Sequence, residues 1–427
     1  MRSLSRLALA MAAVTVTAST AYAQAENIRP VDQRGINVFE APKLDTTKFT
    51  HVTVGFGGAF EQDFQNLTHT NTATPVLVGG VNKNALMPIG PGFTTAMANL
   101  NMNVQLAQGI RVELVSYLST RHHTDTWVKG GYLQIDALPF DIQPLNDLMK
   151  YVTLKVGQFD VDYGDAHYRR TDGGNGMDNP FVGNLIMDAY STEIGATAYY
   201  RRAGFIFAGG FTNGTSDGQV QNPGQHEPAY LGKVGFDRQL TSNFRFRLTA
   251  STYNDAKATS NVLYSGDRAG SHYFDVLENT ASTESGNAWS GNLQPGFTNR
   301  IASYVVNPFL KYNGFEFFGN FETSTGGALT DTTDRTWRQQ SGDFIYRFLG
   351  NEQAYVAFRY NKAEGELVGD PVDADIIRTQ YAFGFFLTKN ILAKVEYVNQ
   401  NYNNFLATDI RNGGNFKGLM LSGVVAF

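Results

Sequence analysis

The chain has 427 residues, a formal net charge of −5 and no cysteine. The acidic balance argues against nucleic acid as a partner, because proteins that bind polyanions are usually basic. No stretch beyond the N-terminus approaches 18 consecutive apolar residues, which argues against a transmembrane helix.

Residues 1–23 have the pattern of a secretory signal peptide. A basic start is followed by an apolar run over 7–16 and by the tripeptide Ala-Tyr-Ala that ends at Ala23. We expect cleavage after Ala23, which removes two arginines and no acidic residue and so changes the net charge from −5 to −7. The alternative, a membrane anchor, needs a longer apolar run. Export without cysteine fits a Gram-negative envelope, where many proteins lack disulfides.

Residues 24–48 are polar and irregular, and we interpret them as a lead-in segment on the periplasmic side without an assigned function. Alternation of apolar and polar residues then begins at Phe49. It is clearest over 100–106, where Leu, Met, Val and Leu alternate with Asn, Asn and Gln. A period of two is that of a β-strand. A soluble β-sandwich and a membrane barrel would both show this alternation. A sandwich would place the apolar face in a core and the polar face in water, whereas a barrel would place the apolar face in lipid and the polar face in the lumen.

Sixteen segments of this kind are predicted. They span 49–60, 98–107, 109–119, 127–138, 151–159, 192–202, 203–212, 229–240, 242–253, 300–312, 315–323, 336–349, 353–362, 375–388, 390–401 and 414–427. Their connections alternate between short turns, such as the hairpin signal Asn313-Gly314, and long loops, of which 61–97 and 254–299 are the longest. A barrel with one rim of short turns explains this alternation. The expected fold is therefore all-β, a transmembrane antiparallel β-barrel of about 16 strands over residues 49–427.

Aromatic residues cluster near the ends of the predicted strands. Phe205, Phe315 and Tyr346 lie near short turns, and Trp337 lies near a long loop. These positions indicate the aromatic girdles of a membrane barrel. The alternative is the ordinary preference of β-strands for aromatic residues.

The connection over residues 160–191 differs from the other loops. It carries six aspartates, two arginines and an apolar cluster, Phe181, Val182, Leu185, Ile186 and Met187. Exposing this cluster to water gains nothing, whereas burying apolar surface contributes about 25 cal/mol per Å². We therefore expect a constriction loop that folds into the barrel, with the apolar residues against the inner wall and the aspartates toward the opening.

The final strand ends in the sequence FKGLMLSGVVAF. It looks like the C-terminal signature of bacterial outer-membrane barrels, whose last residue, here Phe427, is recognised by the barrel assembly machinery. With its sixteen strands and the long loop after the fifth, the chain resembles the bacterial porin superfamily. Residues 155–165, KVGQFDVDYGD, resemble the entry into the loop of the phosphate-selective porin group.

The porin resemblance implies a homotrimer in the bacterial outer membrane, surrounded by outer-membrane lipid. It also implies an inward loop and passive diffusion of small hydrophilic solutes. The phosphate-selective group has basic residues along its pore, whereas the loop here is rich in aspartate. The lead-in segment is a second departure, because general porins begin their first strand close to the mature N-terminus.

Candidate pore-lining and constriction residues are the charged residues of the loop and those that strand parity turns to the polar face. They are Asp160, Asp162, Asp165, Arg169, Arg170, Asp172, Asp178, Arg111, Glu113, Lys155, Arg245, Arg247, Arg359 and Arg378. A basic wall that faces an acidic loop would produce a transverse field and a channel of weak ion selectivity. The alternative is that these charges pair with one another. The two arginines of the loop either project toward the opening or pin the loop through its aspartates.

The HExxH, P-loop and dinucleotide-binding glycine-turn motifs of enzymes are missing. The seven histidines have no metal-ligand spacing, so we expect no metal and no cofactor. The predicted function is an outer-membrane porin. Two alternatives stay open, a surface adhesion or structural barrel that uses its long external loops, and a barrel transporter for apolar solutes.

Overall fold

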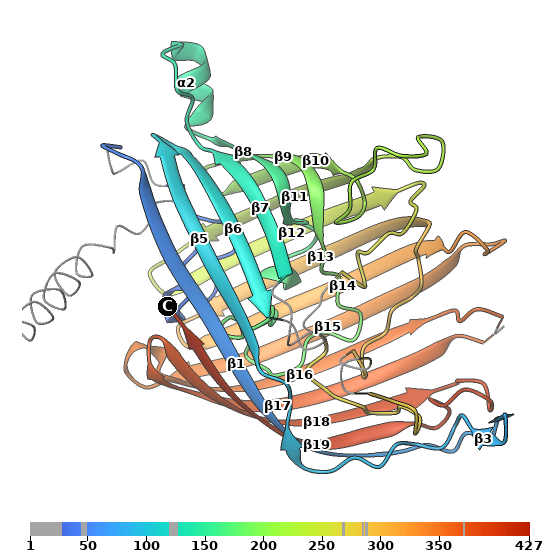
Figure 1. The fold of residues 1–427 in the computed structure, drawn as a ribbon. Coiled ribbons are helices and arrows are strands. Elements are labelled where there is room, and N and C mark those ends of the chain that lie inside the picture. The colour runs from blue at the N-terminus through green and yellow to red at the C-terminus, as the bar shows by residue number, and fades with distance from the viewer. Residues whose placement is uncertain are drawn as a thin grey trace, which may run out of the picture.

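The computed structural model describes residues 28–43, 49–118, 127–266, 270–283, 286, 289–369 and 372–427. Within these residues, sixteen long antiparallel strands form a barrel (Figure 1). The strands are β1 (Thr53–Thr70), β5 (Met97–Ala107), β6 (Ile110–Leu118), β7 (Trp127–Ile135), β8 (Val152–Asp160), β9 (Thr192–Arg202), β10 (Phe205–Thr212), β11 (Ala229–Gln239), β12 (Phe244–Asp255), β13 (Arg300–Tyr312), β14 (Phe315–Gly327), β15 (Arg335–Phe348), β16 (Ala354–Gly365), β17 (Ala374–Thr388), β18 (Ile391–Asn403) and β19 (Asn415–Ala426).

The barrel is closed by its first and last strands. β1 pairs with β19, where Ala59 lies opposite Ala426, and also with β5, where Thr53 lies opposite Gln105. The backbone NH of Phe427 donates to the carbonyl of Gly58 at 2.9 Å. Closure pairs the first and last strands of the barrel sheet in the described residues, so neither is left as an edge strand. The predicted all-β antiparallel barrel is therefore confirmed.

The first strand is longer than predicted. β1 continues to Thr70 instead of ending at residue 60. Residues 61–70 look polar in the sequence, but Glu61, Asp63 and Gln65 alternate on the buried inner face. The period of two thus persists where the inward residues are charged. The connection to β5 contains only the short strands β2 (Leu77–Val78), β3 (Val81–Asn82) and β4 (Gly92–Phe93).

The two faces of the wall have opposite chemistry. Outward side chains such as Phe56, Leu100 and Phe315 are exposed, whereas inward ones such as Arg247 and Arg378 are buried. Apolar residues outside and charges inside suit a barrel surrounded by lipid. Trp337 does not belong to an outer girdle, because it is fully buried and its Nε1 donates to the Glu366 carbonyl at 2.9 Å.

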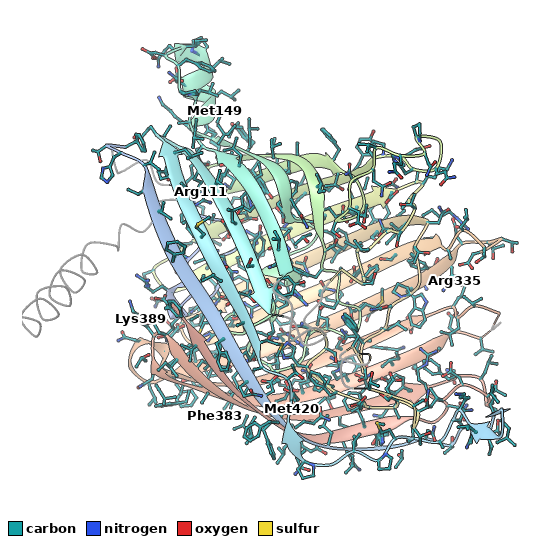
Figure 2. All side chains as sticks on the ribbon, in the orientation of Figure 1. Arg111, Met149, Arg335, Phe383, Lys389 and Met420 are labelled. Atoms are coloured by element: carbon teal, nitrogen blue, oxygen red, sulfur yellow. The ribbon has the colours of Figure 1, made fainter. Side chains whose placement is uncertain are left out.

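Short turns and long connections lie at opposite ends of the barrel. Figure 2 places Lys389, in the β17–β18 turn, and Arg335, at the start of β15, on opposite sides. The β7–β8 connection at the short-turn end carries the helix α2 (Gln143–Met149), which projects from the rim (Figure 1). No helix in the described part of the chain is both long and apolar enough to cross a membrane.

The hydrophobic core lies inside the barrel. Val182 and Ile186 from the β8–β9 connection, and Tyr273 and Val276 from the β12–β13 connection, join inward residues of the wall in one buried cluster. The prediction that 254–299 forms a long external loop is thus wrong for the described residues around Tyr273. The apolar side chains of Tyr273 and Val276 are more stable packed on the inner segment than exposed to water.

Candidate functional site

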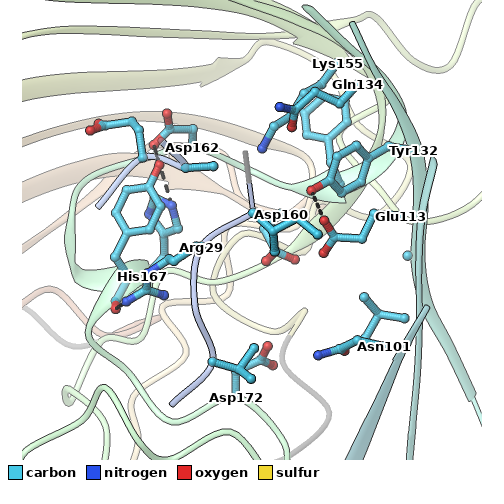
Figure 3. Close-up of a pocket in the computed structure, with 18 of the residues that line it drawn as sticks. Arg29, Asn101, Glu113, Tyr132, Gln134, Lys155, Asp160, Asp162, His167 and Asp172 are labelled. Atoms are coloured by element: carbon cyan, nitrogen blue, oxygen red, sulfur yellow. Dashed lines mark hydrogen bonds and ion pairs between the residues drawn. The ribbon is translucent and has the colours of Figure 1, made fainter. Parts of the chain in front are cut away.

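A cavity of about 210 Å³ remains between the inner segments and one side of the wall. The wall side is formed by β5 to β9, and the inner side by the β8–β9 connection and the N-terminal segment. Figure 3 shows Glu113, Tyr132 and Asn101 on the wall, across from Asp162 and His167. The cavity is therefore a polar space bounded by charges on both sides.

The wall side holds its polar residues in fixed positions. Arg111 Nη2 donates to Gln134 Oε1 at 2.7 Å, and the Tyr132 hydroxyl donates to Glu113 Oε2 at 2.7 Å. The Lys155 ammonium lies over the Tyr132 ring, 5.0 Å from its centroid. Cation–π contact and hydrogen bonds leave these side chains little rotational freedom.

A β-bulge adds a further cation to the wall. The pairing of β6 with β7 shifts between Val115 and Ser116, so that Val115 faces Gly130, Ser116 faces Val128, and Lys129 has no direct partner. Lys129 points into the cavity, where its ammonium contacts Asp172 and lies 3.7 Å from Asp160. A bulge re-aims one side chain without breaking the sheet.

The inner side is mainly acidic. Asp162, Asp172 and Asp178 line the cavity from this side. Asp178 pairs with Arg29 of the N-terminal segment at 3.0 Å, and Asp162 contacts the Lys233 ammonium. Among the lining residues, basic groups thus prevail on the wall and acidic groups prevail opposite them. The wall contributes Arg111, Lys129, Lys155, Arg201, Glu113 and, at the end of β8, Asp160; the inner segments contribute Asp162, Asp172, Asp178, Glu40, Arg29 and Arg170.

Residues 28–43 follow the inner rim at the short-turn end. Gln33 contacts the turns β17–β18 and β15–β16, through its backbone NH to the Lys389 carbonyl at 2.9 Å and its side chain to the Asn351 carbonyl at 2.9 Å. Further along, Lys43 Nζ donates to the Asp136 carbonyl at 2.8 Å. The described part of the lead-in segment therefore lies against the inner wall and narrows the short-turn mouth.

Two other predicted site residues anchor this segment. Arg247 donates to both oxygens of Asp165, each at 2.8 Å, and to both oxygens of Glu40 at 2.6 and 2.7 Å. Arg245 donates to the Asn37 carbonyl at 2.8 Å. Such bidentate bonds fix position strongly. None of Arg245, Arg247 and Asp165 lines the cavity.

Three more predicted residues hold the inner loop to the wall. Arg169 pairs with Glu316, and Arg378 Nη1 donates to the Asn184 carbonyl at 2.5 Å. Arg359 Nη1 donates to the Gly183 carbonyl at 3.2 Å. A Cβ at Gly183 would lie 2.1 Å from the Tyr273 hydroxyl, so the close packing there requires glycine. These arginines are occupied by backbone carbonyls and carboxylates and lie away from the cavity.

Burial changes the protonation of the inner segments. It raises the pKa of Asp178 to about 6, although Arg29 and Arg169 act in the opposite direction. It lowers the pKa of His167 to about 4, so this imidazole is neutral at neutral pH. Burial acts to raise the pKa of the Glu40 carboxyl, but the Arg247 guanidinium has the larger effect and lowers this pKa to about 2.

The structure brings eight of the predicted residues to the cavity: Asp160, Asp162, Arg170, Asp172, Asp178, Arg111, Glu113 and Lys155. Arg170 also pins the loop, since its Nη2 lies 2.6 Å from Asp188 Oδ2. Sequence reasoning missed Lys129, which strict parity cannot place beside a bulge, and Arg29, whose segment has no periodicity.

Comparisons with known proteins point to one class. No protein-family model and no curated protein sequence matches the chain. Among solved structures, the anion-selective porin from Comamonas acidovorans matches with a TM-score of 0.52 and 10% identity, over 88% of this chain and 100% of that one. The outer membrane channel DcaP of Acinetobacter baumannii matches with a TM-score of 0.50 and 11% identity, over 90% and 100%.

The fold is therefore that of the bacterial outer-membrane β-barrels. Within that class the chain resembles the porins, as its sequence predicts. At identities this low the likeness concerns the fold, and the chemistry of this chain has to be argued from its own residues.

Proposed function

We propose that the protein is an outer-membrane porin that lets small hydrophilic solutes and ions diffuse passively through its lumen. The observation that carries the proposal is the charged, polar cavity between the β5–β9 wall and the inner segments. A route for apolar solutes needs an apolar lining, whereas this lining contains opposed carboxylates, ammonium and guanidinium groups. The inward packing around Tyr273 also removes much of the external loop that an adhesin would use.

Residues 160–191 act in this proposal as the constriction loop. Phe181 is fully buried under the Arg359 guanidinium, 4.2 Å from its ring centroid, and the Ile186 NH donates to Asn361 Oδ1 at 2.8 Å. These contacts support the expected packing of the apolar cluster on the inner wall. The narrow passage then has wall cations on one side and loop carboxylates on the other, which favours polar solutes and gives weak ion selectivity.

The setting of the channel is part of the same proposal. The chain is exported, loses residues 1–23 after Ala23, and inserts into the outer membrane through recognition of Phe427 by the barrel assembly machinery. It assembles as a homotrimer surrounded by outer-membrane lipid. Phe427 is exposed at the end of the last strand, which supports its availability during assembly. The mass of the protein in mild detergent tests the trimer.

Planar-bilayer recording tests the channel. Purified protein should give stepwise conductance, and proteoliposomes should swell with small sugars and not with large ones. Tyr132→Ala removes a ring from the cavity and should raise single-channel conductance. Tyr230→Ala is the matched control, because Tyr230 is exposed on the outside of β11 and should change nothing. Barrels that insert correctly and conduct no ions would refute the proposal.

A further inference from the structure

Two carboxylates of β1 meet a histidine of the β12–β13 connection inside the barrel. Glu61, Asp63 and His272 are fully buried, and one oxygen or ring nitrogen from each lies within 4.8 Å of the other two. His272 Nδ1 is 2.8 Å from Asp63 Oδ2. None of the three residues lines the cavity. The cluster is therefore separate from the proposed channel.

Three polar atoms of this cluster have no hydrogen-bond partner among the described residues: Glu61 Oε2, Asp63 Oδ1 and His272 Nε2. The other oxygen of Glu61 is satisfied by Ser422 at 2.6 Å and Lys394 at 3.1 Å. Buried polar atoms are nearly always hydrogen-bonded, because an unpaired one loses its hydrogen bonds to water and gains none in the protein. The two unpaired carboxylate oxygens, Glu61 Oε2 and Asp63 Oδ1, indicate a missing ligand beside His272 Nδ1.

The histidine is held in place by the connection that carries it. The Phe274 NH donates to Gln65 Oε1 at 2.8 Å, and Gln65 Nε2 donates to the Phe274 carbonyl at 2.9 Å. These bonds align the connection with the inner face of β1, so that His272 stands beside Asp63. His272 has a φ of +70°, which is unusual for a residue with a side chain. Such a conformation persists only where the surroundings enforce it.

We propose that Glu61, Asp63 and His272 bind one divalent transition-metal ion of the Zn²⁺ class. With a neutral imidazole, two carboxylates and the Lys394 ammonium leave a net charge of −1, which attracts a dication. An imidazole nitrogen with carboxylate oxygens suits Zn²⁺, whereas Ca²⁺ and Mg²⁺ prefer oxygen alone. The ion fastens the β12–β13 connection to the first strand.

The bond between His272 and Asp63 is consistent with this assignment. Nδ1 and Asp63 Oδ2 lie 2.8 Å apart, which is close enough for both atoms to bind one ion. The ion then replaces the hydrogen bond between them, and the neutral imidazole carries its hydrogen on Nε2. Sequence reasoning could not find the site, because His272 and Asp63 are 209 residues apart.

Metal content of the refolded mature chain tests the inference. Because the three residues are buried, the chain should be refolded in detergent with Zn²⁺, passed through gel filtration with a weak chelator, and assayed by elemental analysis. We expect one Zn²⁺ per chain, and no retained Ca²⁺ in a parallel sample. His272→Ala and Asp63→Asn should each weaken Zn²⁺ binding by 10-fold or more. His226→Ala is the control, since this histidine is distant in sequence and bonds only to the Gln221 carbonyl among the described residues.

Folding is checked separately by the heat-dependent mobility of the barrel on gels. Wild-type protein that folds and retains no more Zn²⁺ than His272→Ala would overturn the proposal and leave an ion-pair cluster in its place. The same conclusion would follow if His226→Ala lost the metal while His272→Ala kept it. Because the wild-type measurement decides on its own, the proposal is testable even if both cluster variants fail to fold.

Discussion

The two sides of the barrel use similar inward residues for different purposes. On β6 to β8, Arg111 and Lys155 face a cavity. On β16 to β18, Arg359, Arg378 and Lys394 face backbone carbonyls of the β8–β9 connection. We call these the open side and the filled side. The difference arises from where the inner segments lie, because residue type and strand parity are the same on both.

The largest effect should come from Arg247, whose guanidinium joins the inner loop to the N-terminal segment. Arg247→Ala leaves the carboxylates of Asp165 and Glu40 buried without their main partner. Loss of one member of a buried ion pair costs about 3–5 kcal/mol of unfolding free energy. Urea unfolding in detergent measures it. Lys155→Ala, on the open side, is the matched control and should cost less than half as much. Equal losses would erase the distinction between residues that anchor the inner segments and residues that line the cavity.

Removal of residues 28–43 should widen the short-turn mouth. The segment lies against the inner rim there, so its deletion should raise single-channel conductance more than any single substitution in the cavity. Arg247 keeps Asp165 as a partner in this variant, which preserves one anchor of the inner loop. Conductance unchanged in a folded, inserted barrel would show that solutes pass elsewhere.

Ion selectivity should respond to charges that line the cavity and not to charges elsewhere on the wall. Two unit charges 4 Å apart interact by about 1 kcal/mol in water, which corresponds to about fivefold in an equilibrium. Lys155→Ala should therefore raise the cation-to-anion permeability ratio by up to about fivefold, and Glu113→Gln should lower it. Reversal potentials measure both. Lys311→Ala, whose ammonium pairs with Glu352 away from the cavity, should leave the ratio unchanged.

A smaller effect should appear with pH. Burial raises the pKa of Asp178 to about 6, so lowering the pH from 7.5 to 5 adds a proton and removes one negative charge from the cavity. Permeability should shift toward anions by a factor below that for Lys155→Ala. The folded state binds this proton more tightly than the unfolded chain, so Asp178 lowers stability as the pH rises from about 4 to about 6. Asp178→Asn should abolish its part of both changes.

Sequence reasoning reached the barrel because periodicity and turn length are local properties. Each strand carries its own alternation, and Asn313-Gly314 marks its own hairpin. The division of the wall into open and filled sides depends on contacts between distant residues. Arg378 meets the Asn184 carbonyl across 194 positions, and nothing near Arg378 distinguishes it from Arg111. The position of Lys129 could not be predicted for another reason, because the bulge breaks the alternation of inward and outward side chains at that residue.

The inner loop also constrains the order of folding. Its apolar cluster is covered by residues that come much later in the chain: the Met187 NH donates to Gln339, 152 residues on, and the Val182 NH to Glu396, 214 residues on. Contacts of such sequence separation form slowly. Until β15 to β18 are in place, Phe181 and Ile186 have no wall to cover them. An incomplete barrel therefore exposes apolar surface and is prone to aggregate until the seam between β1 and β19 closes.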